Sequence, residues 1–209
     1  MRSLVMFVVT IFGLFLSSVL VAQETVSGEF EKVKMKTFDG EKFIFPSDMR
    51  GIKLNIVFLG MSNDQDNGQL QQEQLLEWQA ALEIEQVFSD SVMAYHFPAM
   101  NSPPFFVKGI IANAMSESYQ GKVSLSQAGV MYLGNLDEFA DSLGLQVDSQ
   151  PTIVIADGQG NPLKFFKGSL SELGLVELVM AIRAASGEPE ASVEANEELD
   201  IELSEALAE

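Results

Sequence analysis

The fold prediction rests first on the stretch Gln150-Pro151-Thr152-Ile153-Val154-Ile155-Ala156-Asp157-Gly158-Gln159-Gly160-Asn161-Pro162-Leu163-Lys164-Phe165-Phe166-Lys167-Gly168. Two apolar runs flank a turn that contains two glycines, a pattern typical of a β-hairpin. The next residues, Ser169-Leu170-Ser171-Glu172, match a capping box and predict a helix that runs to Ala185. We therefore expect a strand, a tight turn, a second strand and a closing helix.

The upstream sequence alternates between short apolar runs and segments with apolar residues at helical spacing. A leading strand pair is expected between Gly28 and Pro46, around the turn Asp39-Gly40. Further strands are expected at 53–59, 91–97 and 129–133, and helices at 69–81, 105–115 and 136–143. A polar loop over residues 60–68 joins the first of these strands to the first helix. Strands that alternate with helices predict one α/β domain, which we place at residues 28–186.

This order of elements resembles the thioredoxin-like superfamily over residues 35–185. In that family a proline in the cis form precedes the third core strand, and Pro151 stands at the matching place. The turn Asp157-Gly158-Gln159-Gly160 and the later Gly168 match the family's hairpin turn and the glycine before its last helix. The resemblance implies an α/β fold of three layers, with a mixed central β-sheet and helices on both faces. The longer middle, residues 98–128, is similar to the insertion of peroxiredoxin-like members.

The chain contains no cysteine. The redox motif of the thioredoxin-like family belongs in the loop at residues 60–68, where this chain has Met61, Ser62 and Asn63 instead. Because the thiolate is the nucleophile of that chemistry, thiol oxidoreductase, isomerase and peroxidase activities are excluded. The chain is also similar to cysteine-less thioredoxin-like groups, among them small periplasmic proteins and, more weakly, the mitochondrial ATP-synthase assembly-factor family. The stretch Pro104-Phe105-Phe106-Val107-Lys108-Gly109 carries that weaker similarity.

The N-terminal residues 1–22 have the pattern of a secretory signal. Arg2 provides the charged region, an apolar run extends from Leu4 to Val21, and Ala22 is a small residue before polar sequence. We expect cleavage after Ala22, with retention of residues 4–22 as a membrane anchor as the alternative. Both alternatives place the body outside the cytoplasm, in the periplasm or on the extracellular side.

The charge of the chain is strongly negative and unevenly distributed. The net charge is −18, and residues 187–209 carry nine acidic side chains and no basic one. A negative surface repels phosphate backbones, so we expect no nucleic-acid partner, and no membrane contact unless the N-terminal segment is retained. Residues 187–209 are expected to be a disordered tail. The spacing of Leu199, Leu203 and Leu207 also allows a helix that docks on a partner.

The acidic loop at residues 62–68 is a candidate cation site. It resembles the start of an EF-hand loop, but the twelfth position holds Gln74 in place of the required glutamate. A weaker alternative combines Asp64, Asp66 and Glu73 as oxygen ligands.

Two single residues favour structural roles over chemical ones. His96 is the only histidine, so neither a zinc site nor a serine–histidine pair is expected. We expect His96 to be structural, and Trp78, on the apolar stripe of its helix, to lie in the core. No catalytic residue, metal site or cofactor is predicted.

The leading functional hypothesis is a non-catalytic binding or assembly-factor module that acts on a protein or peptide. By resemblance to the family, Met61, Ser62 and Asn63 should face Gln150 and Pro151 across a groove, with main-chain groups beside the proline free to bind a peptide. One alternative is a protein that binds a small molecule or cation through the loop at 62–68. Another is a non-redox enzyme with carboxylates as acid and base.

Overall fold

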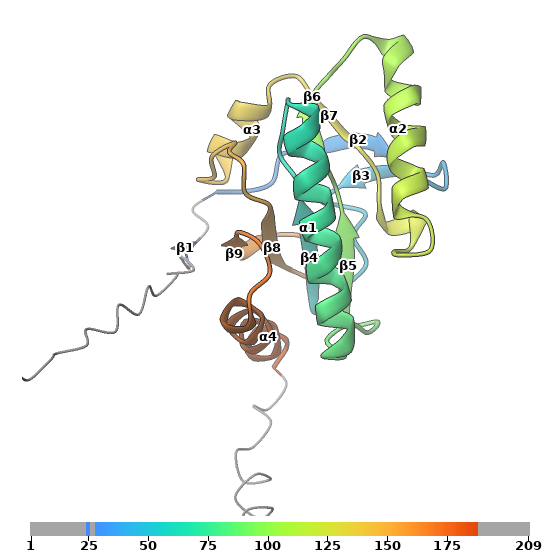
Figure 1. Cartoon of the computed structure of the whole chain (residues 1–209). Helices are drawn as coiled ribbons and strands as arrows, with labels where there is room; N and C mark the ends of the chain where they lie inside the picture. The colour runs from blue at the N-terminus through green and yellow to red at the C-terminus, as the bar shows by residue number, and fades with distance from the viewer. Residues whose placement is uncertain (1–23, 26–27, 188–209) are drawn as a thin grey trace, which may run out of the picture.

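A five-stranded mixed sheet forms the centre of the protein. The computed structural model describes residues 24–25 and 28–187. The strands lie in the order β1-β9-β8-β4-β5 (Figure 1). They are β1 Glu24–Thr25, β4 Leu54–Leu59, β5 Val92–His96, β8 Thr152–Asp157 and β9 Pro162–Lys167. The pair β4 and β5 is parallel, while β8 is antiparallel to both β4 and β9. This sheet and the β8–β9 hairpin confirm the predicted fold class.

Two small sheets lie beside the central one. The first is the antiparallel pair β2 Val33–Lys36 and β3 Lys42–Phe45, which joins around the predicted turn at Gly40. The second is the parallel pair β6 Ala99–Asn101 and β7 Met131–Leu133, and the short 3₁₀ helix η1 Leu125–Gln127 comes directly before β7 in the chain. Strand β6 was not predicted, because it is a three-residue strand close to the prolines that interrupt this region.

Four α-helices complete the domain: α1 Gln65–Ile84, α2 Phe105–Tyr119, α3 Leu136–Ser142 and α4 Glu172–Ser186. Successive side chains of a strand point to opposite faces, so β4 supplies both cores. One core packs Leu54, Ile56 and Phe58 against α1 and α4. The other packs Val57 and Leu59 against α3 and the β2–β3 pair. The sheet is thus covered on both faces, as predicted.

Two helix starts differ from the predictions. Helix α1 begins at Gln65, four residues before the predicted start, because the Asp64 carboxylate accepts a hydrogen bond of 2.8 Å from the Asn67 amide and caps the helix. Half of the expected polar loop is therefore helical. Helix α4 is capped by Ser171, whose hydroxyl accepts a bond of 3.1 Å from the Gly174 amide. The capping box predicted at Ser169 is wrong by two residues.

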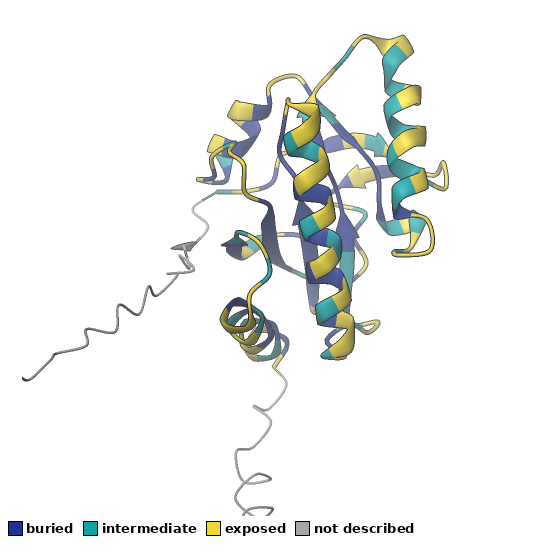
Figure 2. Ribbon diagram, viewed as in Figure 1, coloured by how far each residue is buried: buried dark blue, intermediate teal, exposed yellow. Residues whose placement is uncertain are grey.

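Helix α2 lies at the outside of the domain (Figure 2). Its sequence places Phe106 and Ile110 among apolar residues at helical spacing. Tyr119 is the one residue of α2 that is buried, while Phe105, Phe106 and Ile110 are 86%, 67% and 68% exposed. These three apolar side chains are therefore not part of the core.

The predictions for the two chain ends fall mostly outside the described residues, since the structure describes neither 1–23 nor 188–209. Among the helices that are described, none combines the length and the apolar character that a membrane crossing requires.

Candidate functional site

The segment that replaces the family's redox motif lies between β4 and α1. Met61 and Ser62 are buried, and Asn63 is exposed. The buried amide of Gln71, almost two turns into α1, holds both main-chain groups of Met61. The Met61 N–H donates to Gln71 Oε1 at 2.9 Å, and Gln71 Nε2 donates to the Met61 carbonyl at 3.1 Å. This segment is therefore fixed by α1 itself.

The Ser62 hydroxyl is occupied by local hydrogen bonds. It donates to the Asp64 carbonyl at 2.9 Å and accepts from the Asp64 amide at 3.0 Å and from Asn67 Nδ2 at 3.1 Å. A hydroxyl has one donor and two acceptor positions, so all three are used. Ser62 shapes the turn and has no hydrogen-bonded base that would make it a nucleophile.

The structure brings this segment next to the segment before β8. The Asp148 carbonyl accepts hydrogen bonds from Gln71 Nε2 at 2.9 Å and from Asn67 Nδ2 at 3.2 Å. On the other side, Asn63 Oδ1 accepts from the Asn101 amide at 2.8 Å, which attaches the segment to β6. We call residues 61–63 and 148–151 together the cysteine-less edge.

The prediction of a cis bond at Pro151 is wrong. The cis peptide bond among the described residues is Phe45–Pro46, and the bond between Gln150 and Pro151 is not cis. The Gln150 amide donates to Asp148 Oδ1 at 2.8 Å, and the Pro151 carbonyl accepts from the Gly168 amide at 3.0 Å. These two main-chain groups, which we expected to be free, already have partners. The exposed Gln150 side chain remains available on this edge.

The expected cation ligands do not converge. No group of three carboxylate or histidine side chains that could hold a metal ion occurs in the described part of the chain. Asp64 is used as the cap of α1, and Glu73 lies two turns further along, where its Oε1 accepts from Gln69 Nε2 at 3.0 Å. The early start of α1 separates these side chains, so the arrangement of Asp64, Asp66 and Glu73 as one site is wrong.

Asp157 is the carboxylate whose pKa is shifted by its surroundings, and it serves the hairpin turn. Partial burial acts to raise its pKa, but hydrogen bonds from Asn161, Gln159 and Gly160 outweigh that effect and lower it below the usual value. Asn161 alone donates twice, from its amide at 2.8 Å and its side chain at 2.8 Å. These bonds explain the shift as turn geometry, so Asp157 gives no support to an acid–base pair.

His96 and Trp78 are structural, as predicted. The His96 ring is buried, stacks on Phe58 with centroids 4.3 Å apart, and places Nε2 3.1 Å from Gln79 Oε1. Burial lowers the pKa of His96 to about 3, so the imidazole is neutral at physiological pH. Trp78 is also buried, and its Nε1 donates to the Gly168 carbonyl at 3.0 Å.

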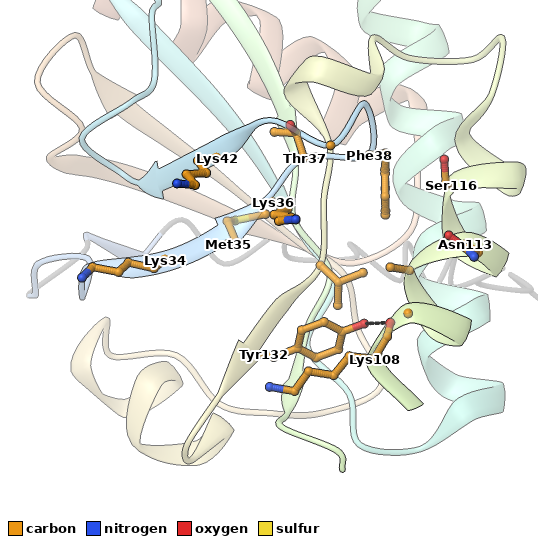
Figure 3. A pocket seen from close by; sticks show the side chains of 14 residues that line it. Lys34, Met35, Lys36, Thr37, Phe38, Lys42, Lys108, Asn113, Ser116 and Tyr132 are labelled. Carbon is orange, nitrogen blue, oxygen red and sulfur yellow. Dashed lines mark hydrogen bonds between the residues drawn. The ribbon is translucent and has the colours of Figure 1, made fainter. Parts of the chain in front are cut away.

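A second candidate site, which the sequence did not reveal, lies between α2 and the β2–β3 pair. It is a cavity of about 540 Å³, and four lysines from these elements line it (Figure 3): Lys34, Lys36, Lys42 and Lys108. The apolar part of its lining includes Phe38, Val130 and Tyr132. We call this cavity the lysine groove. In the sequence, Lys34 and Lys36 alternate along a short strand, which indicates only an exposed face of that strand. Lys108 is distant in sequence, and only the fold brings it close to these two lysines.

Comparisons with known proteins identify the fold. No family model matches the sequence, and a search of curated proteins gives no significant match. Solved structures are similar. One is BsSco, a member of the Sco family of cytochrome c oxidase assembly proteins, with 13% identity and a TM-score of 0.50, over 80% of this chain and 99% of that one.

Two more similar structures come from other bacteria. A SCO1/SenC family lipoprotein from Bacillus anthracis has 10% identity and a TM-score of 0.50, over 78% of this chain and 98% of that one. A proposed protein disulfide isomerase from Bacteroides thetaiotaomicron has 12% identity and a TM-score of 0.50, over 80% of this chain and 94% of that one. These identities show the fold alone. The chain is a thioredoxin-like protein by fold, in a form that has no cysteine.

Proposed function

We propose that this protein is a non-catalytic thioredoxin-like module that binds a protein or peptide partner outside the cytoplasm. The observation that carries the proposal is the construction of the cysteine-less edge. The loop has lost every thiol, yet Gln71, Asn67 and Asn63 still hold it by hydrogen bonds to Met61, Asp148 and Asn101. A surface that is fixed before binding loses little conformational entropy when a partner arrives.

The chemistry of this edge suits recognition. Asn63 and Gln150 are exposed amide side chains, and each amide can donate and accept hydrogen bonds. Asn101, which is bonded to Asn63, is followed closely by Phe105 and Phe106 at the exposed start of α2. Exposed aromatic side chains beside polar groups are typical anchors of protein interfaces. The partner we expect is therefore a polypeptide with apolar side chains and free main-chain groups.

An assembly role and an exported location belong to the same proposal. The similar BsSco is described as belonging to a family of assembly proteins, and another similar structure is a lipoprotein. The signal-like residues 1–22 of this chain favour the same location.

Site-specific photocrosslinking in the native envelope tests the proposal. A photoreactive amino acid is placed at Asn63 or Gln150 of the full chain, and at the exposed Gln159 as a control on the β8–β9 turn. We expect the first two positions to capture the same polypeptide and Gln159 to capture none of it. Equal capture at all three positions, or no capture at Asn63 and Gln150, would contradict the proposal.

A further inference from the structure

The lysine groove concentrates positive charge on an acidic protein. The chain has 12 basic residues against 30 acidic ones, and four of the basic residues line this one cavity. The two ion pairs of the described residues join Arg50 to Asp48 and Lys167 to Asp148, both away from the groove. The four groove lysines thus have no carboxylate partner within the described part of the chain.

The geometry of the β2–β3 pair makes this charge unfavourable on its own. Lys36 lies directly opposite Lys42 in the antiparallel register, and like charges in that position destabilise a strand pair. The turn between these strands contains two carboxylates, and neither forms an ion pair with Lys36 or Lys42; that of Asp39 accepts hydrogen bonds from the Thr37 hydroxyl and the Glu41 amide. Both lysines are exposed and have no ion-pair partner among the described residues, so a ligand with carboxylates would find them available.

The inner surface of the groove is apolar and firmly built. The Tyr132 hydroxyl donates to the Lys108 carbonyl at 2.7 Å, and the Lys108 ammonium lies 5.1 Å from the centroid of the Tyr132 ring. Phe38 packs on Tyr119 of α2 with centroids 5.4 Å apart. The Tyr132 contacts join α2 to β7, and the Phe38 contact joins α2 to the turn of the β2–β3 pair, so α2 is fixed on one side of the cavity (Figure 3). An apolar interior with a cationic rim selects a ligand that carries both carboxylates and apolar side chains.

The chain itself contains a segment of this chemistry. Residues 187–209 combine nine acidic side chains with Leu199, Ile201, Leu203 and Leu207 and have no basic residue. We propose that the C-terminal segment 188–209 docks in the lysine groove of its own chain through charge complementarity and leucine contacts. The acidic remainder of the body repels this segment, so the groove is the place where its charge is favourable.

The length of the segment allows this contact. Its 22 residues can extend to about 70 Å, whereas a folded domain of this size has a radius of gyration of about 15 Å. Covalent attachment gives the segment an effective concentration on the order of millimolar at the groove. Weak individual ion pairs are then enough for docking. The inference stands apart from the proposed function, because it does not involve the cysteine-less edge.

Paramagnetic relaxation enhancement in the full chain tests the proposal. Because the chain has no cysteine, Ser204→Cys creates a single attachment point for a spin label. We expect the label to broaden the amide signals of 34–42 and 108–116, and to leave those of 158–161 unchanged. Raising the salt concentration to about 1 M shortens the screening length to about 3 Å and should remove the broadening.

Matched charge variants decide whether the groove is responsible. The triple variant Lys34→Glu, Lys36→Glu, Lys42→Glu should lose the broadening. A control triple variant makes the same charge change at lysines that do not line the cavity: Lys32, Lys122 and Lys164. The control should keep it. If the glutamate variant does not fold, the glutamine variant of the same three lysines provides the same comparison.

Three outcomes would overturn the proposal. The first is unbroadened groove signals in the wild-type chain at low salt. The second is equal broadening in the two triple variants. The third is broadening that arises only between molecules, seen when isotope-labelled chains without the spin label are mixed with spin-labelled chains, which would identify a second copy as the occupant.

Discussion

The cysteine-less edge and the lysine groove differ in whether their polar side chains have partners within the protein. In the edge, Gln71, Asn67 and Ser62 use their polar atoms on one another and on nearby main-chain groups. In the groove, Lys36 and Lys42 face each other without a carboxylate partner among the described residues. Polar residues in the edge therefore contribute mainly to the fold. The groove lysines have no such partners among the described residues, and the proposed docking of the acidic segment would supply them.

The largest expected effect comes from breaking the edge at Gln71. Gln71→Ala leaves the buried Met61 N–H without its partner and removes the bond to the Asp148 carbonyl. We expect a loss of about 2 to 4 kcal/mol in the free energy of unfolding, measured by urea denaturation. The control Gln69→Ala, at an exposed position of the same helix, should change this free energy by less than about 0.5 kcal/mol. Similar losses for both variants would show that the edge is no more tightly built than the helix surface.

A second effect concerns His96, which lies between α1 and α2. Its ring touches Gln79 of α1 and lies 5.5 Å from Tyr119, the buried residue of α2. Burial lowers the folded-state pKa to about 3, below the unfolded value of about 6.5. The unfolded chain thus binds more protons between these values, so stability is lost as the pH falls through this range.

At pH 5 the expected loss is about 2 kcal/mol relative to pH 7, because each pH unit below 6.5 costs about 1.4 kcal/mol. His96 is the only histidine, so urea denaturation of the wild type and of His96→Gln at several pH values separates its contribution from that of the carboxylates. His96→Gln should flatten the profile between pH 7 and pH 5. A profile as steep in that variant as in the wild type would assign the pH dependence to other groups.

The parts of the fold that were predictable have strong local patterns. The β8–β9 hairpin was predicted because its two apolar runs flank a turn with Gly160. The φ of Gly160 is +86°, a backbone conformation that glycine adopts without steric strain. The start of α1 was missed because Asp64 suits a loop and a helix cap equally well. The sequence did not indicate that Phe105, Phe106 and Ile110 of α2 are exposed, because an apolar helix face normally packs inward and only the tertiary structure shows that these side chains are uncovered.

The two candidate sites also differ in how much of each could be predicted from the sequence. Family resemblance placed Met61 to Asn63 opposite Gln150, and in the structure the side chain of Gln71 donates to the carbonyls of both Met61 and Asp148. Whether a peptide binds there remains a prediction. The lysine groove could not be predicted, because Lys108 is distant in sequence from the β2–β3 pair and alternation along a strand indicates only an exposed face.

The smallest expected effect tests the strain in the lysine groove. Lys36→Glu replaces a like-charge pair with an opposite-charge pair across from Lys42, while Lys34→Glu makes the same change in net charge opposite Ile44. Both variants are compared in a full chain whose tail acids Glu197, Glu198, Asp200, Glu202 and Glu205 are replaced by Gln or Asn. In this background Lys36→Glu should be more stable than Lys34→Glu by about 0.5 to 1 kcal/mol in urea denaturation.

A second comparison sets Lys36→Glu against the chain that keeps Lys36. The gain in the free energy of unfolding from Lys36→Glu should be smaller when the tail keeps all its acidic residues, because the substitution then also removes a cation that the tail uses. If the tail never reaches the groove, the gain in the free energy of unfolding from Lys36→Glu should be the same with the original and with the substituted tail. Equal stability of the Lys34→Glu and Lys36→Glu variants in the background with the less acidic tail would mean that the lysines do not strain the strand pair, since the two differ in cross-strand partner and not in net charge.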